Sequence, residues 1–150
     1  MRNKTVLLID DEQSFLEPLA DALKYEGCRV LKARTADEAF DLLEHEHIDL
    51  VTIDIMLDPG TAFGDDVESH STGLHLCEEI RREWPNIDAF CISVVSDMQI
   101  IKKIESLGVR FLRKGETPLR TVINMLRSRL TGIAYSTERD RKDSRRTDKK

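Results

Sequence analysis

The chain alternates two kinds of apolar pattern. Five short runs in which at least half of the residues are apolar lie at residues 5–9, 28–33, 49–54, 89–93 and 109–112. After each run, apolar residues recur every three or four positions, which is the spacing of one buried helix face. Five strand signals that each precede a helix signal predict a parallel sheet with helices on both faces. Because crossovers of this kind are right-handed, we expect a doubly wound α/β fold.

Polar residues and glycines mark the ends of the predicted helices. The starts that we identify are a capping box of Thr35 with Glu38, a second box of Ser96 with Gln99, and an N-cap at Thr117 with Pro118 as the first helical residue. Gly27 and Gly108 predict the ends of the first and fourth helices.

Acidic residues follow two of the buried runs. Asp10 and Asp11 come directly after the first run, and Asp54 ends the third. Ligands bind at the carboxyl ends of strands in an open parallel sheet, so these carboxylates would meet there if the two strands are neighbours. At about 5 Å and an effective dielectric near 20, each pair would repel by roughly 3 kcal/mol. Such a cluster favours a bound cation, Mg²⁺ or Mn²⁺, and the alternative is two acidic helix N-cap regions.

The fourth and fifth runs lead to a hydroxyl group and a cation, Ser93 and Lys114. Both have a function if Asp54 is a nucleophile toward a phosphoryl group. A metal ion would neutralise the phosphoryl oxygens, Lys114 would pair with the transferred group, and Ser93 would donate a hydrogen bond to it. Taken alone, Ser93 would be an ordinary packed serine and Lys114 an ordinary lysine at a strand end. The combination therefore predicts phosphoryl transfer.

Length, charge and cysteine content restrict the function further. The 150 residues suit one domain, and no apolar run is long enough to cross a membrane. The N-terminus reaches acidic residues too early for a signal peptide, and three widely spaced cysteines suit reduced core residues, which predicts a cytoplasmic protein. The formal charge is −5, but residues 138–150 hold seven Lys/Arg and four Asp/Glu, so the remainder carries −8. This acidic body argues against nucleic acid as the partner of the folded domain.

Four motifs occur in order at successive strand ends: LLIDDE, TIDIML, the Ser93 strand end and FLRK. In this combination, residues 4–130 resemble the receiver domain of two-component response regulators, the family of the chemotaxis response regulator. The resemblance implies a flavodoxin-like sheet of five parallel strands in the order 2-1-3-4-5 with five helices. It also implies a receiver domain over residues 1–131. Residues 132–150 mix both charges with few apolar residues, which predicts a charged flexible tail or linker.

The resemblance assigns a role to each candidate site residue. It implies Asp54 as the phosphorylated aspartate, Asp10 and Asp11 as acids that hold the metal ion together with Asp54, Met56 as a further ligand through its backbone carbonyl, Ser93 and Lys114 as the hydroxyl and lysine of the site, and Phe111 as the aromatic switch that changes rotamer on activation.

A chain of this kind would be a phosphoacceptor switch. A histidine kinase or a histidine phosphotransfer protein would phosphorylate Asp54 in a Mg²⁺-dependent reaction. A downstream protein would then bind the face built from the fourth helix, the fifth strand and the fifth helix. We do not expect an enzyme with an external substrate.

One alternative is a receiver-like interaction module that works without phosphorylation. Another is an aspartyl-phosphate phosphatase of the haloacid dehalogenase type, against which the residues after Glu12 and the lack of a large cap domain argue.

Three features depart from the usual pattern of the family. Gly115 replaces the proline that usually follows the lysine, which predicts a looser turn. Val94 stands where alanine or glycine is usual, so we expect it to narrow access to Asp54 and to slow labelling by small phosphodonors. Residues 58–72 form a long loop, for which we favour a flexible lid or a partner-contact loop over a neutral insertion.

Overall fold

Strands and helices alternate along the whole described part of the chain. The structure, a computed structural model, describes residues 3–56 and 69–132, with side chains from residue 72 onward in the second range. The elements are β1 (Thr5–Ile9), α1 (Gln13–Tyr25), β2 (Arg29–Ala33), α2 (Ala36–His45), β3 (Leu50–Ile53), α3 (Ser69–Glu83), β4 (Asp88–Ser93), α4 (Met98–Ser106), β5 (Arg110–Arg113) and α5 (Leu119–Thr131). The strands form one parallel sheet of order β2-β1-β3-β4-β5. The predicted doubly wound fold and strand order are confirmed.

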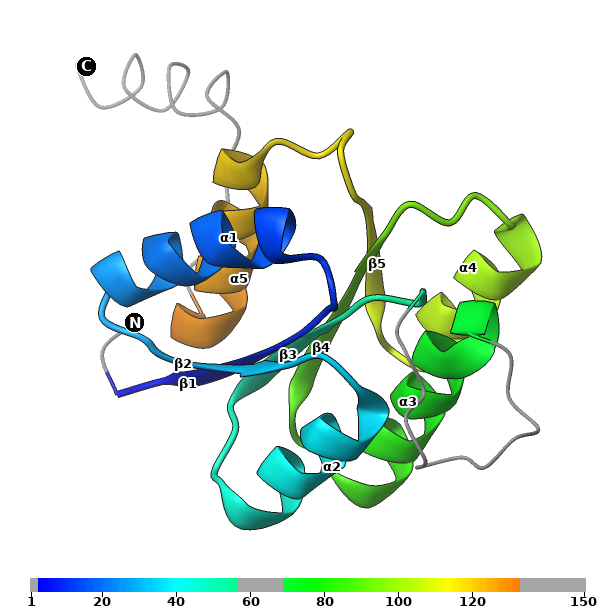
Figure 1. The fold of residues 1–150 in the computed structure, drawn as a ribbon, viewed down its shortest axis with the longest axis horizontal. Helices are drawn as coiled ribbons and strands as arrows, with labels where there is room; N and C mark the ends of the chain where they lie inside the picture. Colours follow the sequence, from blue (N-terminus) through cyan, green and yellow to red (C-terminus); the bar gives the residue numbers. More distant parts are fainter. Residues whose placement is uncertain (1–2, 57–68, 133–150) are drawn as a thin grey trace, which may run out of the picture.

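Helices cover both faces of the sheet (Figure 1). Successive residues of β1 point to opposite faces: Leu7 belongs to one cluster of buried residues and Leu8 to another. The first cluster includes buried residues of α2, α3 and α4, and the second those of α1 and α5. Because β1, β3 and β4 are buried on both faces, most of their residues are apolar, which explains the nearly continuous apolar runs of these three strands.

The predicted capping box at α2 is half confirmed. The Thr35 hydroxyl accepts a hydrogen bond from the Glu38 N–H at 3.2 Å, as expected. The Glu38 carboxylate does not return this bond to Thr35 but accepts from the N–H of Arg34 at 2.7 Å. The carboxylate therefore satisfies an N–H one residue before the expected one.

The two other predicted N-caps are wrong by one residue. At α4 the cap is Asp97 and not Ser96, because the Asp97 carboxylate accepts from the Gln99 N–H at 2.9 Å. At α5 the cap is Pro118 and not Thr117. The ψ of Pro118 is 145°, so its backbone is still extended and the first helical residue is Leu119.

Strand register brings the predicted acids together. Ile9 of β1 pairs with Ile53 of β3, so the next residue of each strand, Asp10 and Asp54, leaves the sheet at the same end. The backbone continues the ladder there, since the Asp54 N–H donates to the Ile9 carbonyl at 3.0 Å. Two neighbouring strands therefore deliver two aspartates to one point.

Helix α3 lies close against the chain that follows β3. The N–H of Gly73 donates to the carbonyl of Ile55 at 3.1 Å. A Cβ atom added at residue 73 would lie 2.2 Å from the Ile55 Cα and 2.5 Å from the carbonyl oxygen of Asp54. Because these atoms are backbone, only glycine allows this approach.

Parts of two expectations fall outside the described residues. Of the predicted loop at 58–72, residues 58–68 lie outside, whereas residues 69–72 belong to the first turn of α3, so the loop prediction is wrong for them. The predicted tail lies outside from residue 133 onward. In the described ranges, the three cysteines are buried, as expected, and no helix is long and apolar enough to span a membrane.

Candidate functional site

Three carboxylates converge at the carboxyl end of the sheet. Oxygen atoms of Asp10, Asp11 and Asp54 all lie within 4.8 Å of one another, and we call these three residues the carboxylate cluster. Asp10 and Asp54 are buried, whereas Asp11 is exposed. Backbone N–H groups orient the two buried members: Glu12 donates to Asp10 at 2.9 Å, and Met56 donates to Asp54 at 3.1 Å. The convergence predicted from the strand ends is confirmed.

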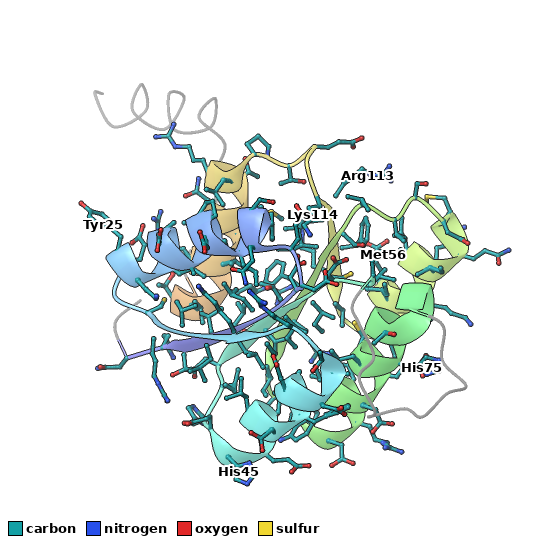
Figure 2. The ribbon with its side chains drawn as sticks, viewed as in Figure 1. Tyr25, His45, Met56, His75, Arg113 and Lys114 are labelled. Atoms are coloured by element: carbon teal, nitrogen blue, oxygen red, sulfur yellow. The ribbon has the colours of Figure 1, made fainter. Side chains whose placement is uncertain are left out.

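Lys114 reaches into this cluster from the end of β5. Its Nζ lies 2.6 Å from Asp10 Oδ2 and 3.4 Å from Asp54 Oδ2, and its side chain is only 6% exposed. Figure 2 shows Lys114 and Met56 at the same end of the molecule. Three carboxylates and one ammonium group leave a formal charge of −2, so the cluster is still short of positive charge.

Burial raises the pKa of Asp10 to about 6, although the hydrogen bonds from Lys114 and Glu12 lower it in part. Desolvation also acts against the charged form of Lys114. However, the hydrogen bond to Asp10 and the negative charges of Asp54, Asp10 and Glu12 outweigh this effect and raise the pKa of Lys114. Lys114 is therefore a cation at neutral pH, held between the two buried carboxylates.

The donor set of the cluster fits Mg²⁺ or Mn²⁺. Both ions prefer oxygen ligands, and Mg²⁺ usually keeps several waters in its shell. The exposed Asp11 faces solvent, which suits a partly hydrated ion, and a divalent charge would balance the −2 of the cluster and Lys114. The residues present therefore match the expected ion.

The remaining predicted site residues lie on the ends of β4 and β5. Ser93 is fully buried, and its hydroxyl accepts from the Val95 N–H at 3.4 Å. Its carbonyl accepts from the Lys114 N–H at 2.9 Å, so the hydroxyl and the lysine occupy adjacent strand ends. Phe111 is partly buried and packs against the hydrophobic core on the sheet face that α2, α3 and α4 cover. Among the described contacts, the hydrogen bond of the Ser93 hydroxyl is thus with backbone and not with Asp54.

Two departures from the family pattern have a structural context. Val94 is 61% exposed, so it stands at the surface of this end of the molecule. Gly115 has φ +86°, which a proline ring, with φ fixed near −65°, does not adopt. The glycine therefore allows a turn of a different shape from one that contains proline.

Two contacts of Lys114 were missed from the sequence. The Glu12 carboxylate forms an ion pair with the Lys114 Nζ at 3.3 Å. The centroid of the Phe15 ring lies 4.7 Å from the same Nζ atom. Glu12 was visible as a third consecutive acid. Phe15 fitted the apolar stripe of α1, so its position over the lysine had no separate signal.

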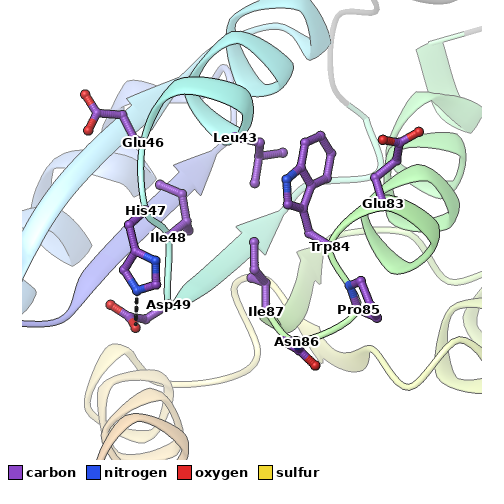
Figure 3. A pocket seen from close by; sticks show the side chains of 10 residues that line it. All are labelled: Leu43, Glu46, His47, Ile48, Asp49, Glu83, Trp84, Pro85, Asn86 and Ile87. Carbon is purple, nitrogen blue, oxygen red and sulfur yellow. Dashed lines mark hydrogen bonds and ion pairs between the residues drawn. The ribbon is translucent and has the colours of Figure 1, made fainter.

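A pocket of about 390 Å³ lies at the opposite end of the sheet (Figure 3). It is lined by residues just before β3 and β4, including Asp49, Trp84 and Ile87. On one side of this pocket, His47 contacts Asp49 at 3.2 Å. Since the carboxylate cluster lies at the other strand ends, this pocket is not part of the candidate site.

Comparisons with known proteins point to one family. A family model described as the response regulator receiver domain matches residues 6–124. The phosphate regulon transcriptional regulatory protein PhoB of Pseudomonas aeruginosa is 29% identical over 109 residues, which cover 73% of this chain and 43% of that protein. A cyclic di-GMP phosphodiesterase of Thermotoga maritima is 27% identical over 111 residues, which cover 73% of this chain and 27% of that protein. The chain thus spans less than half the length of either relative.

Solved structures agree on the fold. A response regulator receiver domain protein from Methanospirillum hungatei superposes with a TM-score of 0.72 at 22% identity, covering 86% of this chain and 94% of that one. A response regulator protein from Burkholderia pseudomallei, solved with a phosphorylated aspartic acid, superposes with a TM-score of 0.66 at 20% identity, covering 96% and 73% of the two chains.

Proposed function

Since the chain belongs to the response regulator receiver domain family, we propose that Asp54 accepts a phosphoryl group in a Mg²⁺-dependent reaction and thereby switches a partner-binding face. The donor is a histidine kinase or a histidine phosphotransfer protein. One observation carries the proposal: Asp54 lies with Asp10, Asp11 and Lys114 at one end of the sheet.

In the proposed reaction, a carboxylate oxygen of Asp54 forms a bond to phosphorus while the bond from phosphorus to the donor histidine nitrogen breaks. Asp10, Asp11 and Asp54, with the backbone carbonyl of Met56, would hold the metal ion. When bound, Mg²⁺ supplies positive charge that lets the anionic nucleophile approach the phosphoryl oxygens. Lys114 is already 3.4 Å from Asp54, so a short movement of its side chain would bring its charge to the transferred group.

The same residues support a switch. A phosphoryl group on Asp54 adds charge beside Lys114, and the buried hydroxyl of Ser93 is available to turn from Val95 toward it. Phe111 lies three residues before Lys114 on the edge strand β5, where it pairs with Cys91 of β4. We propose that its rotamer follows this change and alters the face formed by α4, β5 and α5.

The chain in this account is a cytoplasmic signalling module and not an enzyme with an external substrate. The relative named as a phosphodiesterase is matched over only 27% of its length, and receiver domains interact with histidine kinases and with downstream effectors. The kinase and effector of this chain are proposed only as classes.

Intact-mass spectrometry tests the proposal. The chain is incubated with a panel of phosphorylated histidine kinases, with and without Mg²⁺. We expect a mass gain of one phosphoryl group that requires Mg²⁺ and is lost in Asp54→Asn. The matched control is Asp21→Asn, which changes an exposed aspartate of α1 and should leave labelling unchanged. Labelling of Asp54→Asn at the rate of the wild type would contradict the proposal.

A further inference from the structure

Charge is divided very unevenly along the chain. Residues 1–96 contain eight Lys/Arg and 21 Asp/Glu, a net charge of −13. Residues 97–132 contain eight Lys/Arg and three Asp/Glu, a net charge of +5. This second segment forms α4, β5 and α5. Because β5 is an edge strand, the positive charge is gathered along one edge of an otherwise acidic domain.

Part of this charge is not neutralised inside the domain. Lys102, Lys103, Arg110 and Arg120 are exposed, and none of them forms an ion pair with another described residue. Arg129 has only a long contact, 3.8 Å to Asp88, with both side chains about half exposed. An exposed ion pair of this kind contributes little to stability, so Arg129 can leave Asp88 for a carboxylate of a partner.

Two of these arginines border a small pocket. A cavity of about 220 Å³ between β5 and α5 is lined by Phe90, Arg110, Met125, Ser128 and Arg129. It is smaller than a usual small-molecule site of about 300–1,000 Å³, so it suits one side chain of a protein partner. Guanidinium groups bind carboxylates with two parallel hydrogen bonds, and the partly exposed Met125 can contact the methylene groups of the same side chain.

We propose that the surface around this pocket binds an Asp- or Glu-rich segment of a partner protein. Arg110 and Arg129 contact one carboxylate side chain, and Lys102 and Lys103 on α4 add long-range attraction. This inference deepens the proposed function by naming the chemistry of the downstream partner. It depends on that function for the timing of binding, and the binding itself does not require a phosphoryl group.

Other occupants fit the charge distribution less well. Nucleic acid presents a continuous row of phosphates, which the −13 of the remaining domain would repel. A second copy would have to place its acidic side against this edge, a head-to-tail contact that builds rings or open chains and not a symmetric pair. Arginines on β5 also discourage edge-to-edge pairing of sheets, but this role does not explain the lysines of α4 or Arg129 of α5.

Fluorescence anisotropy with labelled hexaglutamate tests the inference on the full chain. All measurements use Asp54→Asn protein, which cannot be phosphorylated at residue 54. The result therefore tests peptide binding alone and does not depend on whether the proposed phosphorylation occurs. We expect Arg110→Gln/Arg129→Gln to weaken hexaglutamate binding at least tenfold. The matched control Lys24→Gln/Lys32→Gln removes the same charge from exposed positions on α1 and the opposite edge strand, and should weaken binding less than twofold.

Three results would overturn the inference. The first is equal binding by the Arg110→Gln/Arg129→Gln variant and its parent. The second is an equal loss in the lysine control, which would show an effect of net charge only. The third is binding of a single-stranded oligonucleotide, or self-association of the chain, in preference to hexaglutamate. Unchanged circular dichroism of the variants shows that they are folded.

Discussion

Replacing Gly73 by alanine should destabilise the domain, although helix propensity alone predicts the opposite. Alanine in place of glycine inside a helix stabilises it by about 1 kcal/mol. At this position, however, the new Cβ would lie 2.2 Å from the Ile55 Cα, far inside a normal contact, and no side chain can rotate away. Overpacking of this kind costs about 1–3 kcal/mol. Because the obstacle is backbone, we take the upper value and expect a net loss of about 2 kcal/mol.

Urea unfolding, followed by circular dichroism, measures this loss. The control is Glu78→Ala, on the exposed side of the same helix, which should change the free energy of unfolding by less than about 0.5 kcal/mol. Since the added atom also lies 2.5 Å from the carbonyl oxygen of Asp54, Gly73→Ala should weaken Mg²⁺ binding too. A Gly73→Ala protein as stable as the wild type, or more stable, would refute the close packing of α3 on the candidate site.

Three further predictions concern the site and the core. Lys114→Gln removes the ammonium group from the carboxylate cluster, so the free energy of unfolding should fall by about 3 kcal/mol without metal. Saturating Mg²⁺ should restore more stability to this variant than to the wild type, and equal restoration would count against the prediction. Val94→Ala should be labelled by acetyl phosphate about fivefold faster, which corresponds to about 1 kcal/mol of barrier, and unchanged or slower labelling would reject the expected obstruction. Burial raises the pKa of the Cys77 thiol to about 12 and that of Cys91 well above its ordinary value, so at pH 8 both stay protonated and a thiol reagent should label them only after unfolding in urea. Rapid labelling of either in the folded chain would show that the core between α3 and β4 is open.

The site could be predicted where one residue follows one strand. Asp10, Asp54 and Lys114 each directly follow a strand, and parallel strands carry such residues to a common end of the sheet. This argument needs only the strand order, which the resemblance supplies. It does not require the distances between the side chains to be known.

Features that depend on two segments meeting could not be predicted in the same way. Lys114 contacts Asp10 at 2.6 Å, closer than Asp54 at 3.4 Å, and this preference depends on side-chain geometry. The requirement for glycine at position 73 appears only when α3 is placed against Ile55.

The sequence also failed to identify the N-cap residue where two adjacent residues could each take that position. Ser96 and Asp97 are both good N-cap residues, and only the backbone angles of the loop decide between them. Thr117 and Pro118 posed the same choice at α5, which the extended ψ of Pro118 settles. Such one-residue errors do not move the apolar stripe of a helix, so they left the predicted fold unchanged.

The most direct test of the account is to add beryllofluoride, a mimic of the phosphoryl group, and Mg²⁺ to the chain and to follow backbone amide signals by NMR. The account predicts Mg²⁺-dependent shifts at Asp54 and Lys114 that extend through Phe111 to β5 and α4, and predicts none of them in Asp54→Asn. Signals at Asp54 and along β5 that stay unchanged at saturating beryllofluoride and Mg²⁺ would contradict it, and would favour an interaction module that works without phosphorylation.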